Sequence, residues 1–455
     1  MSRIKIAGKL AESGELDRAF SIIEKELEEN PNNAEALVTG SYIMHAAKKH
    51  GIAYHLAKRC TELAPRLYEG WLNYGRVCDQ LFMFNEAERA IKTALVLAKT
   101  DDQRGEIQMN LSCVYLNNGR WKEAEDFARK ALALKESNKA HANLGMALLA
   151  QHKWDKAWEE YSYSLGTSAR RWNQYNNEPR WDGKPVNTLC IYGEQGVGDE
   201  ISFASMIHDA MKDANKIIID CDYKLSKLFR RSFPSASVYG TRWNNELSWK
   251  EEDRNIDASI SSCELGRFYR TKESDFTGDP YLIADPERVL MWSALWREKR
   301  KPVIGIAWSG GVQWTGAKFR KWRIEELNPL FESIDAHWVS LQYKDASKEI
   351  SGTPIFQYPH ATLTDDYDDV AGLVASVDLV ICMQTAVAHL AGALGKECWV
   401  FVPEISQWRY GTDVMPWYKS LKIFRQKGGK WPFEQASQLL YKRYADNGKL
   451  QRAAA

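Results

Sequence analysis

Small residues recur at a regular interval along the first third of the chain, each after a short polar, turn-like stretch. They are Ala19, Ala53, Ala87, Ala124 and Ala157, separated by 34, 34, 37 and 33 residues. Stretches such as "ESGEL", "KHGIA" and "NNGRW" precede them. A small residue at this interval predicts pairs of antiparallel helices, because the second helix of each pair needs a small side chain where it meets the first.

Further positions share the same interval. Gly75 and Gly145 lie twelve residues before their alanines, and Pro31 and Pro65 lie twelve residues after theirs. The whole pattern resembles the tetratricopeptide repeat. We therefore expect an α solenoid over residues 1–166, whose five repeats exceed the about three needed to bury a continuous core.

The concave groove of such a solenoid usually holds an extended peptide or another protein domain. We therefore expect a protein or peptide partner in the groove, and the repeats are also a candidate surface for oligomerisation. Asn73, Asn110 and Asn143 lie at similar positions on the first helices of their pairs. They are candidates to clamp a peptide backbone, although ordinary solvated polar positions explain them more simply.

After Gly166 the pattern changes to short β-branched runs that alternate with helix-like stretches. The runs are "TLCIY", "KIIID" and "ASVYG" in one half, and "VIGIAW", "HWVSLQY", "DLVICM" and "CWVFV" in the other. Such alternation predicts doubly wound parallel sheets. We expect Rossmann-like halves over residues 178–298 and 299–426, a hinge at "WREKRKP" between them, and a C-terminal helix and tail over 427–455. Ligands of this fold class bind at the carboxyl ends of the strands.

Composition narrows the class of partner. The 455 residues contain 61 Lys and Arg against 60 Asp and Glu, so no broad positive field favours nucleic acid, which we do not expect as a partner. The eight cysteines show no CxxC pair, and the N-terminal stretch "MSRIKIAGKL" lacks an apolar signal core. No apolar stretch approaches the roughly twenty residues that span a bilayer. These features predict a cytoplasmic protein with free thiols and no membrane partner.

Two segments carry a family resemblance. "PRWDGKPVNTLCIYGEQGVGDEISFASMI" and, far downstream, "DDVAGLVASVDLVICMQTAVAHLAGALGKECWVFVP" resemble bacterial tetratricopeptide proteins that end in a GT-B glycosyltransferase. That part is similar to the ADP-heptose transferases and more distantly to the protein O-GlcNAc transferases. The resemblance covers about residues 178–426. It implies an α solenoid followed by an α/β GT-B fold, with the acceptor on the first Rossmann-like half and the nucleotide sugar on the second.

The glycine-rich turn "YGEQGVGDE" follows the first predicted strand. Gly193, Gly196 and Gly198 would let the backbone turn sharply beside a ligand, and a helix starting near Asp199 would point its amides at it. We therefore count Gly196 and Gly198 among the ligand-contacting residues. The run is not GxGxxG, so it does not indicate a dinucleotide site.

Asp199 has two interpretations. Aspartate is a favoured N-cap residue, so it could simply cap the helix "EISFASMIHDAM". Alternatively its carboxylate is the general base that takes the proton from an acceptor hydroxyl. The resemblance supports the base, because the equivalent aspartate of the heptose transferases has that role. Glu194 and Glu200 are the alternative bases.

The donor is expected in the second half. "MQTAVAHLAGALG" follows a predicted strand and opens a helix at about Thr385, so the amides of Thr385, Ala386 and Val387 would face a diphosphate. The resemblance places the nucleotide here, commonly with an aspartate where this chain has Gln384. Glutamine donates as well as accepts hydrogen bonds, so Gln384 indicates either a different donor sugar or weakened activity. His389 lies one turn further along. It is a candidate nucleotide contact, although a packed core histidine is the simpler interpretation.

Cations are needed where charge develops on a leaving diphosphate. Lys318 and Arg320 follow the strand "VIGIAW", and Arg320 falls where the glycosyltransferase pattern has a basic residue. Gln342, which follows "HWVSL", completes the predicted nucleotide contacts. Ala317 stands where a P-loop needs lysine, so a P-loop hydrolase is not favoured.

Two other clusters have structural explanations. The acids of "TDDYDDV", residues 364–370, precede a helical pattern, so capping explains them better than metal binding. We expect no metal and no cofactor, only a nucleotide diphosphate sugar as co-substrate. Trp408, Trp417 and Tyr418 are candidates to wall the ligand site, with loop packing as the commoner explanation.

Together these observations predict an inverting, metal-independent GT-B glycosyltransferase whose repeats select a protein acceptor. Two alternatives stay open. The α/β part could be a catalytically inactive domain on a repeat scaffold, which Gln384 favours and the retained Asp199 and Arg320 disfavour. The enzyme could also act on a glycan, a lipid-linked sugar or a nucleobase.

Overall fold

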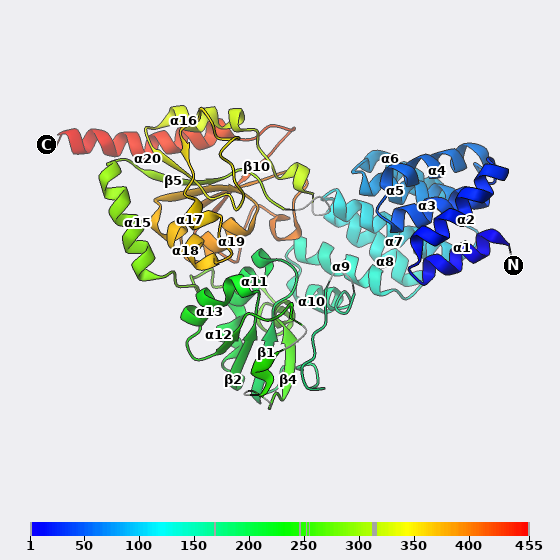
Figure 1. The fold of residues 1–455 in the computed structure, drawn as a ribbon, viewed down its shortest axis with the longest axis horizontal. Coiled ribbons are helices and arrows are strands. Elements are labelled where there is room, and N and C mark those ends of the chain that lie inside the picture. The colour runs from blue at the N-terminus through cyan, green and yellow to red at the C-terminus, as the bar shows by residue number, and fades with distance from the viewer. Residues whose placement is uncertain are drawn as a thin grey trace. The chain divides into compact units, whose positions relative to one another are not determined.

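The computed structural model describes residues 2–167, 170–244, 247–251, 253, 255–311 and 316–453. The chain divides into two compact units. Met1–Gln151 and Glu159–Ser164 form the first, which consists of helices. His152–Trp158 and Leu165–Ala455 form the second, which contains two β-sheets (Figure 1).

The first unit is a solenoid of helix pairs. Its helices, with α10 shared by the two units, are α1 Arg3–Glu12, α2 Leu16–Glu29, α3 Ala34–Ala46, α4 His50–Leu63, α5 Tyr68–Gln80, α6 Phe84–Leu97, α7 Asp101–Asn117, α8 Trp121–Leu134, α9 Asn138–Ala150 and α10 Trp154–Ser162. Consecutive helices from α1 to α9 pack together, and α1, α3, α5, α7 and α9 also contact one another in series. The helices therefore stack as tetratricopeptide-like repeats. Across the described residues, no helix is both long enough and apolar enough to cross a membrane.

The repeated small residues lie where the helices of a pair meet. The five alanines at positions 19, 53, 87, 124 and 157 are fully buried on the second helices. A side chain at Gly75 would overlap Ile91 on the partner helix α6, and one at Gly145 would overlap the backbone of Tyr161 on α10. The prediction of helix pairs packed through small residues is therefore confirmed.

The side chains of Asn73, Asn110 and Asn143 form hydrogen bonds within the solenoid, whereas the simpler expectation is that they face solvent. Asn73 donates to the Val38 carbonyl on α3 at 3.1 Å, and Asn143 donates to the Ser112 hydroxyl on α7 at 2.7 Å. Asn110 donates within its own helix. Asn73 and Asn143 therefore link successive repeats, and their amide donors already have partners within the solenoid.

The first sheet of the second unit is parallel, with strand order β3-β2-β1-β4. Its elements are β1 Val186–Tyr192, α11 Val197–Phe203, α12 Ile207–Ala210, β2 Ala214–Asp220, α13 Ser226–Ser232, β3 Ser237–Tyr239, β4 Ala258–Ser261 and α14 Gly266–Tyr269. The three predicted strands are confirmed. The sequence prediction missed β4, whose residues "ASIS" mix polar and apolar side chains although all are buried.

The second sheet is also parallel, with strand order β10-β9-β8-β5-β6-β7. Its elements are α15 Pro286–Lys299, β5 Val303–Ala307, α16 Asn328–Ser333, β6 His337–Ser340, β7 Ile355–Phe356, α17 Pro359–Thr362, α18 Tyr367–Ser376, β8 Leu379–Met383, α19 Ala386–Ala393, β9 Cys398–Val402, β10 Leu421–Arg425 and α20 Phe433–Ala453. The four predicted strands are confirmed, and β7 and β10 are additional. Parallel strands with intervening helices establish an α/β architecture.

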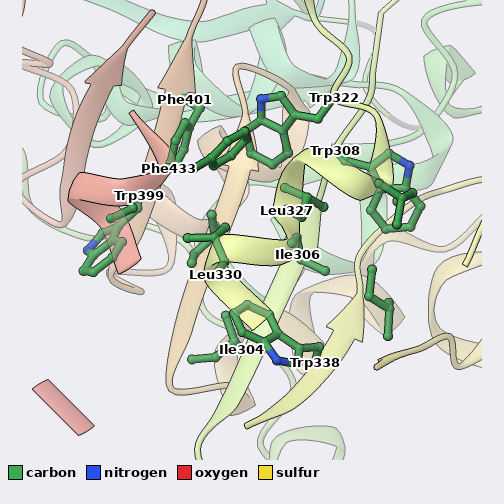
Figure 2. Packing of buried hydrophobic residues seen from close by; sticks show 14 of the residues in the cluster. Ile304, Ile306, Trp308, Trp322, Leu327, Leu330, Trp338, Trp399, Phe401 and Phe433 are labelled. Atoms are coloured by element: carbon green, nitrogen blue, oxygen red, sulfur yellow. The ribbon is translucent and has the colours of Figure 1, made fainter. Parts of the chain in front are cut away.

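One face of the second sheet packs against α16 and α20 around an aromatic core. Trp322 lies edge-on to Phe401 and Phe433, with ring centroids 5.0 and 5.3 Å away (Figure 2). Phe433 and Leu440 of α20 are buried in the same cluster. The predicted C-terminal helix is therefore part of the core of this sheet.

The acidic residues of the segment 364–370 form ion pairs with α13, a helix that belongs to the first sheet. Asp366 caps α18 by accepting from the Asp368 amide at 3.0 Å, as predicted. Asp368 also forms a two-point ion pair with Arg231 of α13 at 2.5 and 2.7 Å, and Lys227 of α13 pairs with Asp366 at 2.6 Å. These carboxylates therefore serve capping and ion pairing between the first and second halves of the α/β unit.

Residues 152–158 belong to the second unit, although the repeat pattern places them in the last repeat. Trp158 is 3% exposed and donates to the Arg270 carbonyl at 2.8 Å. Its ring lies 6.4 Å from that of Phe203 and 6.2 Å from that of Trp408. The second unit therefore begins before the predicted boundary at residue 166, because these side chains complete its core.

We expect Trp158→Ala to destabilise the second unit by about 3–5 kcal/mol, because it removes a buried aromatic ring. Hydrogen exchange of the α11 and α14 amides should accelerate. Trp172→Ala is the matched control, since Trp172 is 52% exposed. Equal protection in the two variants would contradict the role of residues 152–158 in the second unit.

Candidate functional site

The predicted site lies where the first turns of two helices meet. α11 follows β1 through the glycine-rich turn, and α19 follows β8. The two helices pack against each other (Figure 1). A side-chain carbon at Gly198 would lie 3.2 Å from the Ala386 Cα and 3.3 Å from the His389 ring. A side chain at Gly198 would be closer to α19 than ordinary van der Waals contact allows, so glycine favours this close approach of the two helices.

Asp199 lies in the first turn of α11 and uses both carboxylate oxygens. Gly196 is the N-cap residue, so the interpretation of Asp199 as the N-cap, one of the two left open, is wrong. Asp199 instead reaches back, and its Oδ2 accepts from the Gly196 amide at 3.0 Å. Its Oδ1 pairs with Arg409 Nη1 at 2.8 Å, and the side chain stays 26% exposed. Two carboxylate oxygens offer about four lone-pair directions, so Asp199 retains capacity for an acceptor hydroxyl.

The two alternative bases are buried in ion pairs. Glu194 accepts from Arg170 at 2.6 and 2.9 Å and from the Ser261 hydroxyl. Glu200 pairs with Arg242 at 2.7 Å, and the guanidinium opposes the rise that burial causes in the pKa of Glu200. Both glutamate side chains are only 1% exposed. They therefore stabilise the turn, and neither is placed to meet an acceptor.

The start of α19 presents backbone and side-chain donors. Thr385 is the N-cap residue, close to the predicted helix start. A helix supplies no internal acceptor for its first amides, here those of Ala386 and Val387. The Thr385 hydroxyl is buried and has no hydrogen-bond partner within the described parts of the chain. This helix start therefore offers several donors to an anion.

A buried guanidinium and a glycine pair lie beside this helix start. Arg320 is 5% exposed, and its Nη1 donates to the Gln384 carbonyl at 3.5 Å. A side chain at Gly310 would overlap Thr385, and one at Gly311, whose φ is 84°, would overlap the Arg320 guanidinium. Burial lowers the pKa of Arg320. The loop after β5, Arg320 and α19 therefore converge on one place.

The two predicted glutamines position loops. The Gln342 amide pairs with the Ser309 backbone, with its nitrogen 2.9 Å from the carbonyl oxygen and its oxygen 3.1 Å from the amide nitrogen. The buried Gln384 Oε1 accepts from the Gln407 amide at 3.4 Å. Lys318 is exposed, with its Nζ 4.9 Å from the Phe319 ring centroid. Among these residues, Gln384 links the start of α19 to the segment around Gln407.

His389 is a packed histidine, as its simpler interpretation predicted. Its Nδ1 lies 3.2 Å from the Tyr418 hydroxyl, which lies 3.3 Å from the Tyr281 hydroxyl. Tyr281 donates its one proton to the Ile201 carbonyl at 2.6 Å, so it accepts from Tyr418, which in turn accepts from His389 Nδ1–H. Burial lowers the pKa of His389 to about 3, which keeps the ring neutral. The ring therefore joins α19 to α11 through two tyrosines.

Sequence reasoning missed Arg409. It lies in the short 3-10 segment Trp408–Tyr410, is 3% exposed, and stacks against the rings of Phe203 and Trp408 at 4.6 and 4.4 Å. In the stretch "QWRY", only the aromatic Trp408 is a predicted candidate to line the ligand site. An arginine flanked by aromatic residues after a buried strand was the available signal.

The site thus combines a partly exposed carboxylate with two buried guanidiniums and a helix start rich in donors. Asp199 supplies the carboxylate, and Arg320 and Arg409 supply the cations. Within the described residues, no group of three or more His, Cys, Asp or Glu side chains is arranged to hold a metal ion. The arrangement can accept a proton from one ligand group and neutralise an anion beside it.

No family model matches the chain. Protein FlbA of Caulobacter vibrioides is 30% identical over 308 residues, which are 62% of this chain and 51% of FlbA. The chain therefore spans about half the length of this curated relative. Among solved structures, a thermophilic tetratricopeptide protein of Thermus thermophilus is 20% identical, with a TM-score of 0.33 over 36% of this chain and 90% of its own. YrrB, a tetratricopeptide protein with an unusual peptide-binding site, is 20% identical, with a TM-score of 0.26 over 31% and 72%.

We expect acid to destabilise the second unit through His389. The unfolded state takes up a proton near pH 6.5 and the native state only near pH 3, so the free energy of unfolding falls as pH drops between these values. The slope from this group is about 1.4 kcal/mol per pH unit. Urea unfolding should show that the free energy of unfolding falls less between pH 7 and pH 5 in His389→Gln than in the wild type.

The exposed His208 supplies the control, and His208→Gln should retain the wild-type pH dependence. A wild-type slope in His389→Gln as well would show that the buried imidazole is not the group responsible.

Proposed function

We propose that the second unit is a metal-independent, inverting GT-B glycosyltransferase that uses a nucleotide diphosphate sugar. One observation carries this proposal. The carboxylate of Asp199 lies in the turn that packs on α19, whose donor-rich start lies beside the buried Arg320. Sugar transfer needs these two functions side by side, a base for the acceptor and cationic donors for the leaving diphosphate.

The donor diphosphate would bind at the start of α19. The first amides of the helix and the Thr385 hydroxyl supply hydrogen bonds, and Arg320 supplies positive charge. Gly310 and Gly311 allow the loop after β5 to approach them closely. As the bond from the anomeric carbon to the phosphate oxygen breaks, negative charge grows on that oxygen, where these donors stabilise it most.

Asp199 would activate the acceptor. The hydroxyl oxygen attacks the anomeric carbon, its proton passes to Asp199, and the nucleoside diphosphate leaves with the bonding electron pair. A single displacement of this kind inverts the anomeric centre. The exposed quarter of the Asp199 side chain supports this role, since Glu194 and Glu200 are buried in ion pairs.

The architecture and the repeats support the same conclusion. Two parallel α/β sheets present their carboxyl strand ends, where ligands of this class bind. The resemblance to the heptose transferases and O-GlcNAc transferases concerns these same turns. A tetratricopeptide-like solenoid provides an extended concave surface for a polypeptide, so a protein or peptide is the proposed acceptor.

A catalytically inactive binding protein is the second candidate. It is favoured by Asp199, whose oxygens both have partners, and by Gln384, whose carboxamide oxygen holds the Gln407 amide. In that case the same site binds a nucleotide without turnover. Transfer of a labelled sugar therefore separates the two functions.

We expect Asp199→Asn to lower sugar transfer by about 10²- to 10⁴-fold, because asparagine keeps the hydrogen bond to Gly196 but does not take the proton. Release of nucleoside diphosphate from a panel of nucleotide sugars measures this. Asp182→Asn, at an aspartate whose side chain is 57% exposed, is the control. Full activity of folded Asp199→Asn would exclude Asp199 as the base.

We expect Arg320→Ala to weaken nucleoside diphosphate binding by about 10- to 100-fold, the loss typical of a hydrogen bond to a charged group. Thermal stabilisation by ADP, CDP, GDP and UDP gives the measurement. Arg323→Ala, on the same segment with a 79% exposed side chain, should bind like the wild type. If no nucleotide or nucleotide sugar stabilises the wild type, the glycosyltransferase proposal fails.

A further inference from the structure

Arg409 has a buried edge for which no described residue serves as a hydrogen-bond acceptor. Its Nη1 pairs with Asp199, but Nε and Nη2 are buried and have no hydrogen-bond partner in the part of the chain that the structure describes. Buried donors are nearly always paired in folded proteins. These two nitrogens form the side-on fork of the planar guanidinium, whose spacing matches two oxygens of one phosphate or carboxylate.

The surroundings keep this edge in place. The guanidinium contacts the rings of both Phe203 and Trp408, at 4.6 and 4.4 Å from their centroids, which limits its rotation. The segment that carries it is tied to the start of α19, because the Gln407 amide donates to Gln384. An arginine fixed in this way is preorganised, so little side-chain entropy is lost when a ligand binds.

A second buried donor lies next along the chain. The Tyr410 hydroxyl is fully buried and also has no partner among the described residues. The Tyr410 ring lies 6.1 Å from that of His389 on α19. The Tyr410 hydroxyl therefore resembles the Thr385 hydroxyl at the start of α19. Burial of either group is unfavourable unless a ligand forms a hydrogen bond with it.

The position of Arg409 indicates which part of a bound nucleotide sugar it would contact. One end of the guanidinium contacts Asp199, the proposed base, at 2.8 Å. A group on the adjacent edge therefore lies close to the place where the acceptor hydroxyl and the anomeric carbon must meet. The donor groups that must reach this place are the sugar-linked phosphate and the transferred sugar itself.

We propose that Arg409 is a donor-binding residue whose Nε–Nη2 edge holds a two-oxygen anion of the donor while Nη1 holds Asp199. This inference rests on the proposed glycosyltransferase function. The anion has two sources with the same chemistry, the sugar-linked phosphate of the diphosphate or a carboxylate on an acidic sugar. In either case one guanidinium connects the proposed base to the donor.

The test is a double-mutant cycle on ligand binding. Arg409→Lys keeps the charge but removes the fork, and it is combined with Asp199→Asn, which removes the carboxylate partner. Calorimetry measures binding of ADP, CDP, GDP, UDP and inorganic pyrophosphate, and of UDP-glucose against UDP-glucuronate. Arg323→Lys is the matched control, and circular dichroism verifies folding of each variant.

If the sugar-linked phosphate is held, we expect Arg409→Lys to weaken nucleoside diphosphate binding at least about 10-fold, both in the wild-type background and in the Asp199→Asn background. If a sugar carboxylate is held, diphosphate binding stays unchanged, and the preference for UDP-glucuronate over UDP-glucose falls by a similar factor. A residue that only supports Asp199 would show no effect in the Asp199→Asn background, and that result would overturn the inference.

Failure of the proposed function gives a different pattern. If no nucleotide binds but pyrophosphate binds and depends on Arg409, the anion site stands without the glycosyltransferase function. A third pattern is nucleotide binding that depends on Arg320, while Arg409→Lys changes neither diphosphate binding nor the preference for UDP-glucuronate over UDP-glucose. In that case the proposed function stands and the inference about Arg409 fails. Absence of binding by every probe would overturn both.

Discussion

The close approach of α11 and α19 is the constraint on which the site depends. Gly198 favours it, because a side-chain carbon there would lie only 3.2 Å from the Ala386 Cα and 3.3 Å from the His389 ring. The approach brings two turns from different sheets together, one carrying Asp199 and the other Thr385. Neither turn alone has both a carboxylate and a set of anion donors. The proposed chemistry therefore belongs to the contact between the two halves of the α/β unit, and the absence of a side chain at Gly198 leaves room for that contact.

Buried ion pairs hold the glycine-rich turn in this position. Arg242 pairs with Glu200 and donates to the carbonyl of Gln195, which has a left-handed φ of 63°. Glu194, in the same turn, is held by Arg170. Burying charges costs desolvation energy that their attraction roughly offsets, so such pairs contribute less to stability than to a single defined geometry. Two of the three acids in "YGEQGVGDE" thus hold the turn, and the third faces the site.

Aromatic side chains form the other support. Phe203 and Trp408 both contact the Arg409 guanidinium, and both also lie beside Trp158. Residues 152–158, which continue the repeat pattern, therefore take part in the packing around the site. This explains why the α/β unit begins inside the last repeat, since a unit starting at residue 166 would leave this cluster incomplete.

The sequence by itself determined the repeat period, the main parallel strands and the two turns that open α11 and α19. These follow from local patterns, such as Ala53 and Gly75 at fixed spacing or glycines directly after a buried strand. Only the tertiary structure decided that Glu194 and Glu200 are buried, that His389 is neutral, and that Arg409 meets Asp199. Asp199 and Arg409 are 210 positions apart, and nothing in either local pattern encodes the other. Burial and ion pairing are set by which segments pack together, and that depends on the whole chain.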